Sequence, residues 1–277
     1  LQIYGIKNVR VRDNIFNINN VHRVMKVTAG LFDTDFDPVT NRTEDVIISG
    51  NRVRGNTTSG KQVCDLFLGT TNARISDNDV LVRGFGVIWE NKTGYPYSDE
   101  DGNDVFTSLK FIGNDTDHEN IGIRIQGAYG GTSWVQNSYD TAIIEDNVFS
   151  KYGSDSACVD VRFLDVFKCR GNIVKVRDPS TSSTNSLGKV LVDFGSCGDV
   201  DICHNTIDGG HIRFTYPTSN TQGDSFAANQ RIVKVTDNEF VDYKSRAGIY
   251  ISNSGAPGPL NVMDLSNDSF AIVDKKL

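Results

Sequence analysis

The chain has 277 residues, of which 38% are hydrophobic and 23% charged, and its formal net charge is −7. The sequence has no block of five or six like charges and no basic stripe, so nucleic acid and anionic membranes are disfavoured as partners. No stretch approaches the roughly 18 apolar residues of a spanning helix, so no membrane insertion is expected.

An eight-residue pattern recurs along the chain. Its first and third residues are apolar, its sixth is asparagine and its eighth is apolar. The segment 46–53 is the clearest copy, and nine copies follow one another at spacings of 25 to 37 residues. A unit that recurs at such spacing predicts a solenoid, in which each coil buries its apolar face against its neighbours. The nine asparagines are Asn14, Asn51, Asn78, Asn114, Asn147, Asn172, Asn205, Asn238 and Asn267.

Each repeat contains two strand-like segments. Apolar residues stand five and three positions before the asparagine and two after it, and this period of two is typical of a strand. A second segment of alternating, β-branched residues follows each asparagine. These second segments are 63–68, 87–90, 123–126, 159–163, 190–194, 212–215 and 249–252. Two strand-like segments per repeat predict an all-β parallel β-helix of about nine coils, forming a single domain over residues 1–277.

The leucine-rich repeat is the alternative, because its core motif has the same asparagine spacing. Five of the eight gaps exceed the roughly 20–29 residues of that repeat, and the returning segment has no helical period, so the β-helix is favoured. The polar loops 33–45, 91–107, 128–140, 178–188 and 216–230 enter at the same point of the coil, so we expect them on one edge. Because 3–11 already has the pattern of a coil under way, we expect the chain to be part of a longer protein, or a partner to cover this end.

The repeated asparagines are interpreted as structural rather than as ligand-binding residues. Asp-Asn and Gly-Asn are turn dipeptides, because asparagine tolerates the left-handed region and can bond to its own backbone. Stacked coils would align the asparagines into a ladder of side-chain amides. Cys64, Cys158 and Cys169 lie in strand-like runs and are expected to be buried hydrophobes rather than disulfide partners.

Residues that alternate with the apolar positions of the second segments are expected to face outward and to form the candidate site. The outward couples are 88/90, 124/126, 160/162, 191/193, 213/215 and 250/252, with Asp65 one coil earlier. Arginine forks suit carboxylated or hydroxylated sugars, and aromatic rings stack on sugar faces. The expected sugar-binding residues are Asp65, Arg124, Gln126, Arg162, Arg213, Tyr250 and Trp134.

Three acids in these couples are the catalytic candidates: Glu90, Asp160 and Asp193. Carboxylates about 5–5.5 Å apart suit a retaining glycosidase, and those about 6.5–9.5 Å apart suit an inverting one. Because neighbouring coils lie about 4.8 Å apart, both spacings are available on adjacent or next-but-one coils. The alternative is that these acids form ion pairs with Arg124 and its neighbours across the coils.

One acidic loop has the oxygen spacing of an EF-hand calcium site. Its ligand positions 1, 3, 5, 9 and 12 would be Asp33, Asp35, Asp37, Asn41 and Glu44. Pro38 stands where the EF-hand has its glycine, and no helix flanks the loop, so an acidic surface loop is the alternative. No cofactor is otherwise expected.

The nine asparagine-turn coils with polar loops resemble the right-handed parallel β-helix of the pectin-lyase-like superfamily. Within it, the acidic, loop-rich character is most similar to bacteriophage tailspike and polysaccharide depolymerase proteins. The resemblance implies a homotrimer, located in the virion or outside the cell, that binds and cleaves a bacterial surface polysaccharide. It carries over no catalytic motif, and acid/base hydrolysis is the expectation from the three candidate acids. A polysaccharide lyase, a non-catalytic adhesin and a structural fibre segment therefore stay open.

Overall fold

The computed structural model of the protein describes most strands and turns of the chain. The described residues are 1–21, 23–28, 43–57, 63–67, 70–83, 87–92, 108–119, 121–126, 141–151, 157–162, 164–176, 190–193, 197–215, 233–241, 249–252 and 263–271. They contain strands and turns but no helix, and thus no helix long and apolar enough to cross a membrane.

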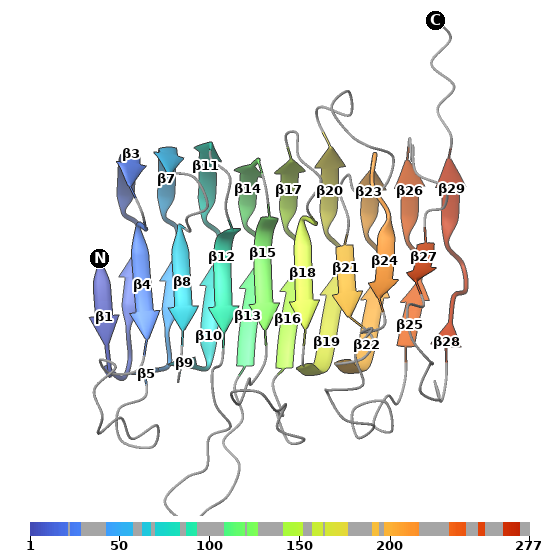
Figure 1. Cartoon of the computed structure of the whole chain (residues 1–277), viewed down its shortest axis with the longest axis horizontal. Coiled ribbons are helices and arrows are strands. Elements are labelled where there is room, and N and C mark those ends of the chain that lie inside the picture. The colour runs from blue at the N-terminus through green and yellow to red at the C-terminus, as the bar shows by residue number, and fades with distance from the viewer. Residues whose placement is uncertain are drawn as a thin grey trace, which may run out of the picture.

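Three nine-stranded sheets wind into a solenoid, and neighbouring strands within each sheet run parallel (Figure 1). Sheet A contains, in order, β1 Gln2–Tyr4, β4 Met25–Thr28, β8 Cys64–Phe67, β12 Val87–Lys92, β15 Ile121–Gln126, β18 Val159–Arg162, β21 Val190–Asp193, β24 Ile212–Thr215 and β27 Ile249–Ser252. Sheet C contains β2 Arg10–Arg12, β6 Ile47–Ser49, β10 Ala73–Ser76, β13 Ser108–Ile112, β16 Thr141–Glu145, β19 Leu164–Arg170, β22 Cys197–Cys203, β25 Val233–Thr236 and β28 Met263–Asp264. Sheet D contains β3 Ile15–Val21, β7 Arg52–Thr57, β11 Asp79–Arg83, β14 Asp115–His118, β17 Val148–Lys151, β20 Ile173–Val176, β23 Thr206–Asp208, β26 Glu239–Val241 and β29 Ser269–Ala271. A small sheet B pairs β5 Thr43–Glu44 with β9 Thr70–Thr71.

The predicted fold class, an all-β parallel solenoid, is confirmed. The strand before each asparagine lies in sheet C, the strand after it in sheet D, and the predicted second segment in sheet A. Each coil therefore has three strands instead of two, because the asparagine turn separates two short strands that the sequence pattern merged. About four turns can be followed in the described residues, so the predicted number of nine coils is not established. The expected loops lie almost entirely outside the described residues.

The repeated asparagines form a buried ladder of side-chain amides between sheets C and D. In one rung, the backbone N–H and the Nδ2 amide of Asn51 both donate to Oδ1 of Asn78, at 3.0 and 2.9 Å. The same amide also donates to the carbonyl oxygens of Val11 and Ser49. The pattern repeats through Asn238, and the rungs from Asn51 onward are at most 2% exposed. The expected structural role is confirmed for these residues.

The residue before each asparagine adopts the left-handed conformation, and aspartate alternates with glycine there. In the first six coils these residues are Asp13, Gly50, Asp77, Gly113, Asp146 and Gly171. A Cβ built on Gly171 would lie 2.5 Å from Oδ1 of Asp146, and one on Gly113 would lie 3.0 Å from Oδ1 of Asp77. Each aspartate thus occupies the space above the next coil's glycine. This contact explains why the two residue types alternate.

The ninth repeat is displaced by one residue from the position that the sequence indicates. Asn267 is the left-handed residue of this coil, with φ 60°. The next residue, Asp268, takes the ladder position and accepts hydrogen bonds from the backbone and Nδ2 of Asn238, at 2.8 and 3.0 Å. The sequence pattern missed this because a carboxylate oxygen can accept the ladder bonds as an amide oxygen does.

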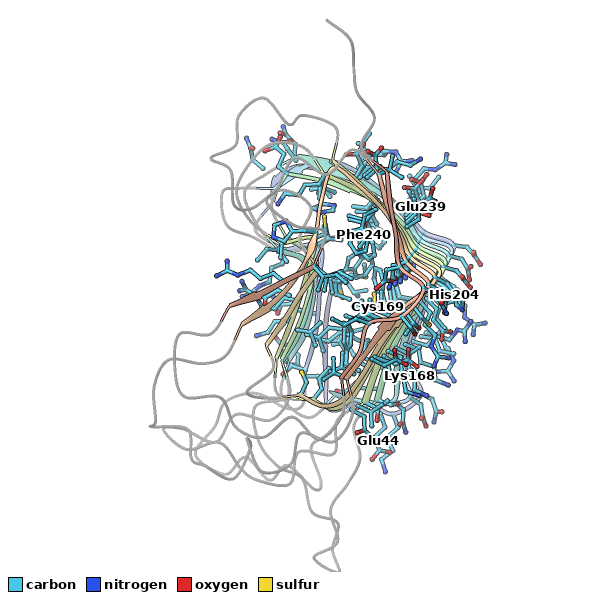
Figure 2. The ribbon with its side chains drawn as sticks, turned by 90° about the vertical axis from the view of Figure 1, so that its right-hand side faces the viewer. Glu44, Lys168, Cys169, His204, Glu239 and Phe240 are labelled. Atoms are coloured by element: carbon cyan, nitrogen blue, oxygen red, sulfur yellow. The ribbon has the colours of Figure 1, made fainter. Side chains whose placement is uncertain are left out.

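The interior is filled by aliphatic residues with a short run of aromatic rings. Trp89 packs edge-on against Phe111 at 5.6 Å between ring centroids, and Phe111 stacks on Phe149 at 6.0 Å. All five cysteines are buried and free, which confirms the expected role of Cys64, Cys158 and Cys169 as small hydrophobes. Viewed along the solenoid, the interior side chains lie between sheet A and the wall formed by sheets C and D (Figure 2).

Candidate functional site

Backbone pairing in sheet A aligns one row of mostly charged positions across eight strands. From β4 to β27 the row consists of Lys26, Asp65, Glu90, Arg124, Asp160, Leu191, Arg213 and Tyr250. Neighbouring positions are about 4.8 Å apart, the separation of paired strands. Six of the ten residues predicted to bind or cleave a sugar lie in this row, because the strand register alone aligns them. They are Asp65, Glu90, Arg124, Asp160, Arg213 and Tyr250.

Arg124 and Asp160 form the best-defined contact in this row. Nε of Arg124 donates to Oδ2 of Asp160 at 3.1 Å. Asp160 is only 2% exposed, although its neighbours Val159 and Val161 are the ones that belong to the core. The Arg124 side chain keeps 30% of its exposure. The buried carboxylate therefore fixes a guanidinium that still reaches solvent. For Asp160, this is the ion pair across coils that was expected as the alternative to catalysis.

The observed register places Glu90 differently from the expected outward couples. Those couples put Glu90 level with Gln126, whereas in the structure it pairs with Arg124, and Lys92 pairs with Gln126. β15 begins at Ile121, two residues before the predicted start. Ile121 and Ile123 are both buried. Because a period of two is unchanged by a shift of two residues, apolar alternation could not select the register.

Glu90 consequently lies beside Asp65 on one side and Arg124 on the other. It shares its row with Asp160, two coils away. The third acid, Asp193, is outside this row, because Asp160 pairs with Leu191 and Asp193 pairs with Thr215.

For the other predicted sugar-binding residues, the structure gives the strand pairing of the backbone or does not describe the residue. Gln126 pairs with Arg162 in a second row of sheet A. Arg213 pairs with Tyr250 at the C-terminal end of the first row. Trp134 lies outside the described residues.

The predicted calcium loop falls mostly outside the described residues as well, including Asp33, Asp35, Asp37 and Asn41. Glu44 belongs to strand β5, and its Oε2 lies 3.3 Å from Nζ of Lys7. The described residues contain no cluster of three or more histidine, cysteine or acidic side chains that could hold a metal. The calcium site stays a prediction.

A buried polar cluster between sheets D and A was not found by sequence reasoning. His118 and Lys151 pair in register on β14 and β17, and both are fully buried, as is Cys158. Burial, with a smaller contribution from Lys151, lowers the pKa of His118 to about 3, and burial raises the pKa of the Cys158 thiol to about 11. Neither His118 ring nitrogen has a hydrogen-bond partner among the described residues. The sequence gives no signal for this cluster, because its members lie in unrelated repeats.

No protein-family model matches the chain, and comparison with curated proteins and with solved structures found no significant match. The parallel solenoid itself is established, whereas a relation to the pectin-lyase-like superfamily or to tailspikes has no support from these comparisons.

Proposed function

We propose that the protein binds a polysaccharide along sheet A and cleaves it by hydrolysis, as a glycan depolymerase. The observation that carries the proposal is the in-register row of acids and arginines from Asp65 to Arg213. A row that follows the solenoid axis suits a long, unbranched ligand, because successive coils meet successive sugars. Arginine is the residue that best matches carboxylates and vicinal hydroxyls.

Hydrolysis needs one carboxylic acid to protonate the glycosidic oxygen and one carboxylate to attack the sugar or to activate water. Asp65 and Glu90 occupy neighbouring coils, and Glu90 and Asp160 are two coils apart. Positions about 4.8 Å apart are close to the spacing of a retaining pair, and positions about 9.6 Å apart lie at the upper limit for an inverting pair. Since Asp160 is buried against Arg124, we assign it the positioning of that arginine, and we assign catalysis to Asp65 and Glu90.

Binding without cleavage is the second candidate function, and the Arg124–Asp160 contact favours it. This acid is engaged in holding an arginine, which is the arrangement expected of a site that only recognises an anionic or hydroxylated sugar. The homotrimer and the location in a virion or outside the cell belong to the proposal through the sequence resemblance only.

Incubation with a panel of bacterial capsular and O-antigen polysaccharides, followed by mass spectrometry of the products, tests the proposal. Shortened oligosaccharides that have gained one water per cleaved bond are the expected result. Unsaturated uronate ends would instead establish a lyase, and retained binding with intact polysaccharide would establish the second candidate. Neither binding nor cleavage of any panel member would contradict both.

A further inference from the structure

The outer face of sheet C carries a row of basic side chains that the linear sequence does not display as a stripe. Register aligns one position across all nine strands of the sheet. Its residues are Arg10, Ile47, Arg74, Lys110, Ile143, Lys168, Asp201, Lys234 and Asp264. Over the first six coils the row therefore contains four cations and no acid. Figure 2 shows Lys168 on the outside of the ribbon, with Cys169 turned inward.

The central cations of this row form no ion pair within the part of the chain that the structure describes. Arg74 and Lys110 are exposed and Lys168 is half-buried, and none of the three forms an ion pair with a described residue. The nearest acid in the row, Asp201, is bonded to Arg170. In a chain of net charge −7, aligned cations without acidic partners leave a local positive potential for an external anion.

The residues on either side of the row limit the width of the anion that can bind. On one side, the positions two residues earlier carry the amide and hydroxyl groups of Asn72 and Ser108, which are hydrogen-bonded to each other at 3.1 Å. On the other side, the half-buried Glu145 lies two residues after the row, and the left-handed turn three residues after it carries the exposed acids Asp77 and Asp146. Three residues of strand span about 10 Å, so the basic row forms only a narrow strip of positive charge. A membrane surface or a nucleic-acid duplex would meet the acids, whereas a single extended chain would not.

We propose that sheet C binds a single chain of an anionic, carboxylated polysaccharide, aligned with the solenoid axis over Arg74, Lys110 and Lys168. The row follows the axis, and its cations lie one or two coils apart, about 5 or 10 Å. Charges at these intervals suit a polymer with one carboxylate on successive or alternate sugars. The inference does not rest on the function proposed above, because it concerns a different sheet and requires no cleavage.

Isothermal titration with polygalacturonate tests the proposal, with neutral dextran and a short DNA duplex as comparison ligands. The double variant K110E/K168E is expected to lose at least tenfold in affinity for polygalacturonate. Lys175, an exposed cation on strand β20 of sheet D, supplies the control. K175E changes the charge by the same amount per residue and is expected to change the affinity less than twofold. Circular dichroism melting establishes that all variants are folded.

Three results would overturn the proposal. If the wild-type protein does not bind polygalacturonate, carboxylated polysaccharides are not its ligand. Equal weakening by K175E and by the single variant K110E shows diffuse electrostatics rather than a row. Tighter binding of the duplex than of polygalacturonate shows that the width of the basic row does not exclude a duplex. Each outcome is independent of polysaccharide cleavage on sheet A.

Discussion

Oδ1 of Asp268 accepts two hydrogen bonds from Asn238, in the ladder position that asparagine occupies in every earlier repeat. An aspartate cannot supply the amide donor that every other rung provides. Its second oxygen, Oδ2, is buried and has no hydrogen-bond partner among the described residues. Burial raises the pKa of Asp268, although the two bonds from Asn238 act in the opposite direction. The last rung is therefore the weak end of the ladder.

Replacing Asp268 with asparagine is expected to stabilise the protein by about 1 kcal/mol at neutral pH, because the new amide restores a donor. Because the folded pKa of Asp268 is raised, protonation of this residue favours the folded state at low pH. That contribution to the free energy of unfolding is lost as pH rises through the folded pKa. The gap between variant and wild type should therefore widen from acid to neutral pH. Urea unfolding at several pH values measures it, with Asp208→Asn on sheet D as the control. A less stable D268N at neutral pH would contradict the interpretation.

Removing an interior asparagine of the ladder should lower the free energy of unfolding far more than removing one at its end. Oδ1 of Asn147 accepts from the backbone and Nδ2 of Asn114, and its own amide donates to Asn172 and to the carbonyl of Phe111. Asn147→Ala leaves several buried groups unpaired, so we expect a loss of about 3–5 kcal/mol in the free energy of unfolding.

Asn14 supplies the matched comparison, because it is exposed and forms the first rung. Asn14→Ala is expected to cost about 1 kcal/mol. Chemical denaturation of both variants gives the difference, and equal losses would show that the ladder does not depend on burial.

The aspartate–glycine alternation predicts a coupling between neighbouring coils. Gly171→Ala places a Cβ at φ 63° and 2.5 Å from Oδ1 of Asp146. The left-handed backbone costs about 1–2 kcal/mol and the overlap about 1–3 kcal/mol more. Adding Asp146→Gly removes the overlap but not the backbone cost, so the double variant should recover part of the loss. A double-mutant cycle measures the coupling, and strict additivity would refute the steric explanation.

Buried His118 predicts a loss of stability in acid. Its folded pKa of about 3 is far below the ordinary value near 6.5, so between these values the unfolded chain binds a proton that the folded chain does not. This contribution to stability is complete above pH 6.5 and is lost as pH falls towards 3. His118→Leu should therefore flatten the decline of unfolding free energy with acid, by up to a few kcal/mol. An unchanged slope in the leucine variant would indicate that other groups cause the decline.

The sequence contains most of the information about the fold. The asparagine repeat predicts the ladder, because a buried amide at a turn must find partners in the adjacent coils. The seven second segments all coincide with strands of sheet A, since their alternation reflects one buried face. The third strand per coil and the shift to Asp268 were missed because the eight-residue pattern spans two strands and treats asparagine as the only ladder residue.

The candidate site was less predictable, because contacts across coils depend on register rather than on composition. Glu90 beside Arg124 requires a two-residue shift that alternation cannot detect. Arg74, Lys110 and Lys168 are 36 and 58 residues apart in sequence, so no window of the chain contains the basic row. The burial of Asp160 also has no sequence signal, since an acid between two valines usually faces solvent.

The most direct test of the account compares cleavage rates of E90Q and wild type on a polysaccharide that the wild type shortens. Asp115→Asn, an exposed acid on sheet D, serves as the control. The account predicts that E90Q lowers kcat/KM at least a hundredfold, the lower range for loss of a general acid or base, while D115N keeps wild-type activity. Equal rates for E90Q and wild type would contradict the assignment of catalysis to the charged row of sheet A.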